Sequence, residues 1–119
     1  IGCEIDEKVF LQANSNIAQA GFAKYIEIHN KDFYDLQIKS KPGIIVCNPP
    51  YGKKLGEENA LKDLYLKIGT TVKNNFSGWD FWLLSGNPLL TKYLKMKASI
   101  KIPVSNGGID CRWIKYLIR

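Results

Sequence analysis

The sequence has few of the residues that build metal centres. It contains one histidine and three cysteines, and Cys3, Cys47 and Cys111 are far apart, with no Cys-x-x-Cys pair. A structural zinc site needs about four cysteine or histidine ligands at short spacings, so the sequence predicts no metal site. Each cysteine lies in an apolar run, which predicts reduced thiols packed in the core of a cytoplasmic protein.

Long apolar runs are also absent. No run reaches the roughly 20 residues that a membrane-spanning helix requires, and no charged and then apolar leader with a cleavage site is visible. We therefore expect no membrane partner.

Acidic residues are in the minority, because 11 Asp and Glu stand against 17 Lys and Arg, which gives a net charge of +6. A basic surface favours polyanions such as RNA, although ordinary solubility explains the charge equally well.

What is present is an alternation of strand and helix patterns. The run 43–47 is continuously apolar, as expected of a strand buried on both faces, and Asn106-Gly107 predicts a hairpin. Strands are expected at 1–4, 25–28, 43–47, 80–85, 98–104 and 109–118, and helices at 7–20, 57–74 and 88–95, the first capped by Asp6 and stopped at Gly21. This order predicts an α/β fold in one domain over 1–119, mostly a parallel sheet with a C-terminal antiparallel hairpin.

The most informative segment follows the apolar run 43–47. It reads Asn48-Pro49-Pro50-Tyr51-Gly52. In open α/β sheets, ligands bind at the carboxyl ends of the strands. Consecutive prolines have a fixed φ and no N–H group, so they hold a rigid, extended loop whose carbonyl groups are free to contact a ligand. A rigid turn without chemistry is the plainer interpretation of the same residues.

Methylation of an aromatic amine explains why these residue types occur together. The lone pair of such a nitrogen is delocalised, and two acceptors that bind its hydrogens localise it. The Asn48 side chain and the Pro49 carbonyl are candidate acceptors, and Tyr51 offers a ring on which a base can stack. Asn48, Pro49 and Tyr51 are therefore candidate catalytic residues. The candidate substrate contacts are Pro50, Tyr51, Gly52, Lys53 and Lys54, with Lys39 and Lys41 on a nearby loop.

On these motifs the sequence resembles class I methyltransferases, and among them the bacterial 23S ribosomal RNA guanine-N2 methyltransferases, whose catalytic domain usually follows an RNA-binding THUMP domain. The resemblance covers nearly the whole chain. It rests on Gly2 to Asp6, Asn14 to Asn16, Ala20-Gly21, Asp32-Phe33, Asn48 to Gly52, Lys54 to Gly56, Leu64-Tyr65 with Ile68-Gly69, and Asn106 to Cys111.

The resemblance implies a Rossmann-like fold, S-adenosylmethionine as cofactor and ribosomal RNA as partner. It places Glu4 on the cofactor's ribose hydroxyls, with Ile5 beside it, Asp32 on the adenine amino group and Phe33 against that ring, and it places Asn48 near the reacting methyl group. Each residue also has a structural explanation. Glu4 is also explained as a solvated acidic residue on the surface, and Phe33 as an ordinary aromatic residue of the core.

Two departures from the family pattern stand out. The Gly-rich loop of the first motif, which holds the methionine part of the cofactor, is not found in these residues. We therefore expect a fragment that lacks the first strand, completed by an upstream part of the same protein, which includes a THUMP domain in the family, or by another chain. Lys54 also stands where the family has arginine, which keeps the charge but loses the planar fork.

Several alternatives remain open at this stage. An adenine-N6 methyltransferase on DNA or RNA uses the same Asn-Pro-Pro-Tyr chemistry, and so does a glutamine-methylating enzyme, although the C-terminal residues fit the latter poorly. A non-catalytic RNA-binding module is the alternative from another class. Cytosine-C5 methylation through Cys47 is disfavoured by the motif that follows it. The sequence does not define the oligomeric state.

Overall fold

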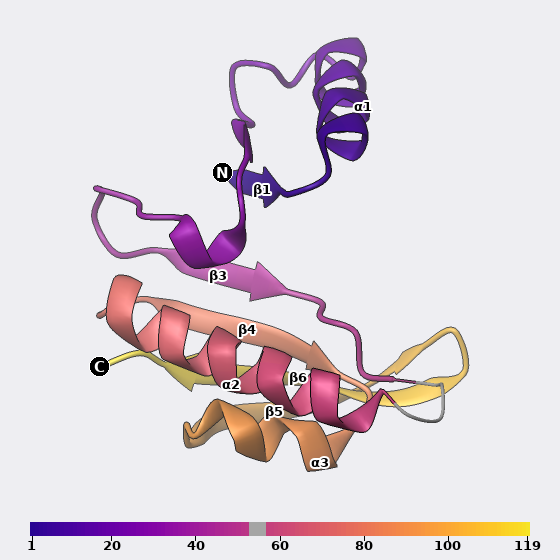
Figure 1. The fold of residues 1–119 in the computed structure, drawn as a ribbon, viewed down its shortest axis with the longest axis vertical. Helices are drawn as coiled ribbons and strands as arrows, with labels where there is room; N and C mark the ends of the chain where they lie inside the picture. The colour runs from indigo at the N-terminus through magenta and orange to yellow at the C-terminus, as the bar shows by residue number, and fades with distance from the viewer. Residues whose placement is uncertain (53–56) are drawn as a thin grey trace. The chain divides into compact units, whose positions relative to one another are not determined.

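The computed structural model describes residues 1–52 and 57–119 (Figure 1). It divides into two compact units, Ile1–Gln37 and Ile38–Arg119. None of the helices in the described residues has the length and hydropathy that crossing a bilayer requires. The expectation of one catalytic domain over residues 1–119 stays a prediction.

The first unit is a short strand–helix–strand motif. Strand β1 (Gly2–Glu4) leads into helix α1 (Glu7–Gln19), and strand β2 (Ile28–Asn30) pairs in parallel with β1. The predicted cap is confirmed, because the Asp6 carboxylate accepts a hydrogen bond from the Val9 N–H at 2.9 Å and so satisfies a free amide of the first turn. Gly21, at a φ of 78°, follows the helix as predicted.

The second strand of this unit was predicted too early in the chain. Residues 25–28 were expected to be extended, but β2 begins only at Ile28, opposite Gly2. The Tyr25 and Ile26 N–H groups both donate to the Phe22 carbonyl, at 2.9 and 3.0 Å. These bonds close a turn and remove Tyr25 from the sheet. A short 3₁₀ helix, η1 (Phe33–Asp35), follows β2 and was not predicted.

The second unit is a four-stranded sheet with helices on one face. The sheet order is β3-β4-β6-β5, with β3 and β4 parallel and the other neighbours antiparallel. This confirms the predicted C-terminal antiparallel hairpin. The elements are β3 (Ile44–Cys47), α2 (Glu58–Asn75), β4 (Asp80–Ser85), α3 (Pro88–Thr91), the 3₁₀ helix η2 (Lys92–Leu94), β5 (Ala98–Asn106) and β6 (Ile109–Leu117). The predicted helix over 88–95 is therefore α3 followed by η2.

The core of the second unit lies between α2 and the sheet. Figure 1 shows α2 running along the strands on one face of this sheet. Its buried residues are Tyr65, Ile68, Gly69, Thr71 and Val72, and the buried sheet residues include Phe81, Leu83, Ile114 and Tyr116. Burial of each large apolar side chain stabilises the fold by roughly 1.5–3 kcal/mol. This core fixes the position of the loops at the end of the sheet.

The expectation that the strand at 43–47 is buried on both faces was wrong. Ile45 and Cys47 share the helix-covered face with their register partners Phe81 and Leu83. Ile44 and Val46 point to the opposite face and are 64% and 66% exposed, because no described element of residues 38–119 covers them. Of the three cysteines, all free, only Cys111 is buried, so the core prediction holds for Cys111 and not for half-buried Cys3 and Cys47.

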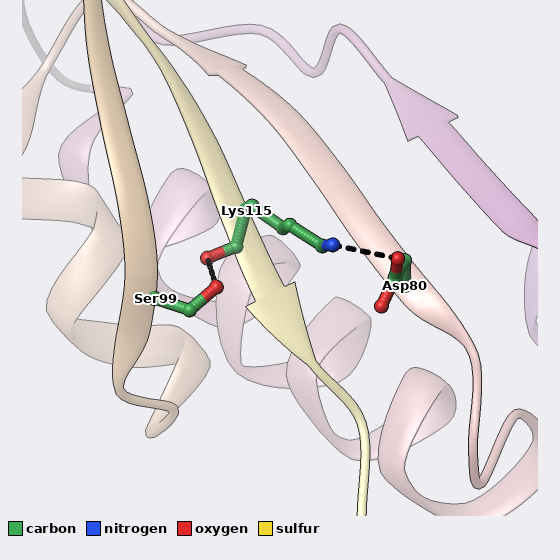
Figure 2. Close-up of polar contacts among 3 residues, drawn as sticks. All are labelled: Asp80, Ser99 and Lys115. Atoms are coloured by element: carbon green, nitrogen blue, oxygen red, sulfur yellow. Dashed lines mark hydrogen bonds and ion pairs between the residues drawn. The ribbon is translucent and has the colours of Figure 1, made fainter.

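The hairpin turns one residue later than its Asn-Gly signal suggests. Asn106 pairs with Ile109, and the loop is Gly107-Gly108 with φ values of 59° and 81°, the left-handed conformation of a two-residue turn. At the other end of the hairpin, the Lys115 Nζ lies 2.7 Å from the Asp80 Oδ2, and the Ser99 hydroxyl donates to the Lys115 carbonyl at 3.2 Å (Figure 2). These contacts join β4, β5 and β6.

Gly69 is required by the close approach of α2 to η2. A Cβ atom at this position would meet the backbone of Leu94, within 2.9 Å of its Cα and still closer to its carbonyl oxygen. We expect Gly69→Ala to lower the free energy of unfolding of the intact protein by about 1–3 kcal/mol, although alanine is favoured over glycine in a free helix by about 1 kcal/mol. Chemical denaturation measures this. Thr70→Ala, on the exposed side of α2, serves as the control, and a stabilised Gly69→Ala variant would contradict the packing described.

Candidate active site

Three loops meet at one edge of the four-stranded sheet. The parallel strands β3 and β4 end there, so Asn48 and Gly86 begin loops on the same edge. Strand β6 is antiparallel to β4, so the turn between β5 and β6 is also at this edge. A surface pocket of about 300 Å³ is lined by Asn48, Pro49, Pro50, Tyr51 and Gly52. Carboxyl ends of parallel strands are where ligands bind in such sheets.

The Asn48–Gly52 segment is anchored to the core by helix α2. The Tyr65 hydroxyl donates to the Pro50 carbonyl at 3.2 Å, and the Tyr65 side chain is fully buried. A tyrosine hydroxyl is protonated at neutral pH, as a donor must be, and burial raises the pKa of Tyr65 further above its ordinary value. Pro49 is buried as well. Gly52 has a φ of 72°, a left-handed conformation that favours glycine, and a Cβ atom there would lie 2.6 Å from the Leu61 Cδ1 of α2.

The Tyr51 ring is held from two sides. A Cβ atom placed on Gly86 would lie 2.5 Å from the Tyr51 Cε2 and 2.6 Å from its Cδ2, so the ring lies directly against the Gly86 backbone. The Asn106 Nδ2 donates to the Tyr51 hydroxyl oxygen at 3.2 Å. The ring is half-buried and keeps part of its surface open to a planar ligand.

Asn48 differs from its neighbours because it is exposed. Within residues 1–52 and 57–119, its side chain has no hydrogen-bond partner. A side-chain amide without a partner among these residues is available for a ligand. Asn48, Pro49 and Tyr51 line one pocket on this loop, and their catalytic role stays a prediction.

The acidic candidates lie at the equivalent edge of the first unit. Glu4 ends β1, and Asp32 follows the end of the parallel strand β2. Burial raises the pKa of the Cys3 thiol, with the charges of Asp32 and Glu4 as further causes, so both carboxylates lie within electrostatic reach of Cys3. One oxygen of Glu4 accepts from the Asp6 N–H at 2.9 Å, and one oxygen of Asp32 accepts from the Tyr34 N–H at 3.1 Å.

The two apolar residues predicted to contact the cofactor, Ile5 and Phe33, differ in exposure. Ile5 is 68% exposed, and its carbonyl accepts from the Asn30 side chain at 3.2 Å. Phe33 is half-buried in the 3₁₀ helix η1, with its ring centroid 6.0 Å from that of Tyr34. The Asn30 bond fixes the backbone after β1, and the exposed Ile5 side chain offers an apolar surface.

Some sequence-predicted residues are not placed, and some residues at the site were missed. Lys53 and Lys54, predicted as substrate contacts, lie outside the described residues. Tyr65, Gly86 and Asn106 contact the Asn48–Gly52 loop, although sequence reasoning gave them no role there. In the part of the chain that the structure describes, no three His, Cys, Asp or Glu side chains are arranged to hold a metal ion.

Comparison with known proteins agrees with the fold and the motifs. The chain is 39% identical over 115 residues to the protein named "Putative RNA methyltransferase slr0064" from Synechocystis, covering 97% of this chain and 30% of that protein. It is 35% identical over 112 residues to the ribosomal RNA large subunit methyltransferase K/L of Legionella pneumophila, covering 94% of this chain and 16% of that protein. The chain thus spans less than a third of these curated relatives.

A solved structure supports the same fold. The protein SMU.472, described as "a putative methyltransferase complexed with SAH", aligns with a TM-score of 0.88 and 21% identity over 100% of this chain and 32% of that one. This likeness confirms the predicted α/β methyltransferase fold. Residues 1–115 match the model of the UPF0020 family, and the chain therefore belongs to the RMKL-like methyltransferase domain family.

Proposed function

We propose that this chain forms the catalytic part of an S-adenosylmethionine-dependent enzyme that methylates the exocyclic amino group of an RNA base, namely guanine N2 of 23S ribosomal RNA. The observation that carries the proposal is the Asn48–Gly52 loop, which presents an exposed amide, unpaired among residues 1–52 and 57–119, beside a tyrosine ring held by Gly86 and Asn106. The curated relatives named as ribosomal RNA methyltransferases support RNA as the substrate.

The loop provides what the reaction requires. The Asn48 Oδ1 and the Pro49 carbonyl oxygen accept hydrogen bonds from the two N–H groups of the amine, which directs the nitrogen lone pair out of the base plane. Stacking on Tyr51 keeps the nitrogen in line with the methyl carbon. A base in a duplex must leave its stack to reach this ring.

Methyl transfer to the amine requires no strong base in the site. S-adenosylmethionine, when bound, supplies a methyl carbon attached to a positively charged sulfur. Glu4, Asp32 and Phe33 would hold the cofactor, which would give this methyl group to the amine nitrogen and keep the electron pair of the broken carbon–sulfur bond on its sulfur. The alkylated nitrogen is positively charged and acidic, so it releases one proton to water. Asn48, Pro49 and Tyr51 would hold and orient the amine during the transfer.

The first unit carries groups that fit the cofactor. Glu4 and Asp32 each have one carboxylate oxygen engaged by a backbone N–H, which leaves the second oxygen for the ribose hydroxyls and the adenine amino group respectively. Exposed Ile5 and half-buried Phe33 offer apolar surface near these carboxylates. We assign the methionine part of the cofactor to a Gly-rich loop outside residues 1–119.

The RNA contacts extend the proposal beyond the pocket. Lys39 and Lys41 are exposed on the second unit, and with Lys53 and Lys54 they would neutralise backbone phosphates. We also propose an upstream RNA-binding domain of the THUMP type, which would add to the affinity for RNA. We further propose that the enzyme is cytoplasmic, as expected of one that acts on bacterial ribosomal RNA.

The reaction product distinguishes guanine from adenine. The full-length protein is incubated with methyl-labelled S-adenosylmethionine and unmodified large-subunit ribosomal RNA, and the RNA is digested to nucleosides for mass spectrometry. The proposal expects the label in N2-methylguanosine. Label in N6-methyladenosine would overturn the guanine assignment, and binding of RNA without any transfer would indicate a non-catalytic module.

Asn48→Ala tests the role of the loop. We expect turnover to fall by at least about 100-fold, because one of the two acceptors on the amine is lost, while calorimetry with S-adenosylhomocysteine shows binding retained. Asn74→Ala, an exposed asparagine at the opposite end of α2, is the matched control and should keep wild-type turnover. Wild-type turnover in the Asn48→Ala variant would contradict the proposed function.

A further inference from the structure

Residues outside the Asn48–Gly52 segment hold its tyrosine ring. Asn106 lies at the end of β5, next to the Gly107-Gly108 turn, and its side chain reaches a residue 55 positions earlier in the chain. Gly86 follows the last residue of β4 and lies against the ring itself. The ring therefore has a flat backbone surface on one side and a polar contact at its hydroxyl.

The sheet register is what brings Asn106 to the tyrosine. Asn106 pairs with Ile109 across the hairpin, and β6 continues antiparallel to β4. Both glycines of the turn have positive φ values, 59° and 81°, so the turn is tight and the position of Asn106 follows directly from the pairing. A side chain placed in this way acts from a stable strand end.

We propose that Asn106 is a positioning residue, which holds the Tyr51 ring in place for the incoming base, with Gly86 as the surface that sets the ring plane. The inference builds on the proposed methyl transfer to a base and identifies what orients its stacking platform. A tyrosine ring without a tether at its hydroxyl swings about the Cα–Cβ bond. The hydrogen bond from the Asn106 amide to the hydroxyl oxygen restrains this swing, and contact of the ring with Gly86 restrains its rotation about the Cβ–Cγ bond.

The hydrogen bond from Asn106 to Tyr51 is exposed to solvent, and this distinguishes a role in positioning the ring from a role in stabilising the fold. Asn106 is exposed, so loss of its hydrogen bond costs little stability, about 1 kcal/mol or less, since water replaces the amide. When a base covers the ring, water is excluded and the same bond becomes stronger. Its effect should therefore appear in turnover of the RNA substrate and hardly in the unfolding midpoint.

A double-mutant cycle tests the link between the two side chains. In the full-length protein we expect Asn106→Ala and Tyr51→Phe each to lower kcat about tenfold, because both break the same bond and release the ring. The double variant should be no more than about twofold worse than either single variant. The KM for S-adenosylmethionine should not change. Ser105→Ala, one residue earlier on the same strand, controls for changes to the hairpin.

Two outcomes would overturn the inference about Asn106. The first is wild-type kcat in Asn106→Ala, and the second is multiplication of the two losses in the double variant, which would show that Asn106 acts independently of the tyrosine. These results differ from failure of the proposed function itself. If Asn48→Ala is inactive while Asn106→Ala is fully active, only the positioning role fails.

Gly86→Ala tests the other side of the ring. Gly86 does not have a positive φ, so alanine is compatible with the backbone, but its Cβ would lie 2.5 Å from the Tyr51 Cε2 and would push the ring away. We expect kcat/KM for RNA to fall at least about tenfold with an unchanged unfolding midpoint. Wild-type kcat/KM would show that the ring position against Gly86 is not required.

Discussion

The candidate site depends on the hydrogen bond from the Tyr65 hydroxyl to the Pro50 carbonyl. Tyr65 is fully buried in the middle of the α2 core, so its hydroxyl has a fixed position set by packing. Pro50 cannot pair through an N–H group, and its carbonyl is the point at which the loop is fastened to the helix. A buried hydroxyl without this partner would carry a desolvation cost of about 1–3 kcal/mol, which opposes movement of the loop.

Rigidity at this point has consequences along the loop. Two prolines precede Tyr51, so fixing the Pro50 carbonyl restricts the orientation of the residues on both sides. The Asn48 amide remains exposed and unpaired in the described residues, while the tyrosine ring is held against Gly86 and Asn106. The loop thus combines a fixed backbone with polar groups that are free for a ligand. Such preorganisation is what stabilisation of a transition state requires.

The sequence predicted local features better than distant contacts. Asp6 as a helix cap, the hairpin near Asn106 and the loop after β3 were all predicted from neighbouring residues. The strand expected at 25–28 was misplaced because a hydrogen-bonded turn at Phe22 competes with the sheet, which short-range propensity does not reveal. The continuous apolar run at 43–47 predicted a strand correctly, but such a run carries no information about which face a helix covers.

The contacts around Tyr51 were beyond sequence reasoning for a related reason. Gly86 and Asn106 reach the ring only because β4, β5 and β6 pair in one particular register. In the sequence, Gly86 resembles an ordinary turn glycine and Asn106 an ordinary hairpin residue. Tyr65 lies on the predicted buried face of its helix, so the sequence indicated only a role in the core for it. Its hydroxyl was the signal that it had a second role, because a buried tyrosine requires a polar partner.

Tyr65→Phe in the full-length protein tests the dependence of the site on its anchor most directly. The ring still fills the core, so the free energy of unfolding should fall by only about 1 kcal/mol, while kcat for RNA methylation should fall about tenfold because the loop is released. Tyr25→Phe, at a tyrosine that is 79% exposed, is the control. A Tyr65→Phe enzyme with the wild-type kcat would contradict the account, since the loop would then keep its geometry without the bond.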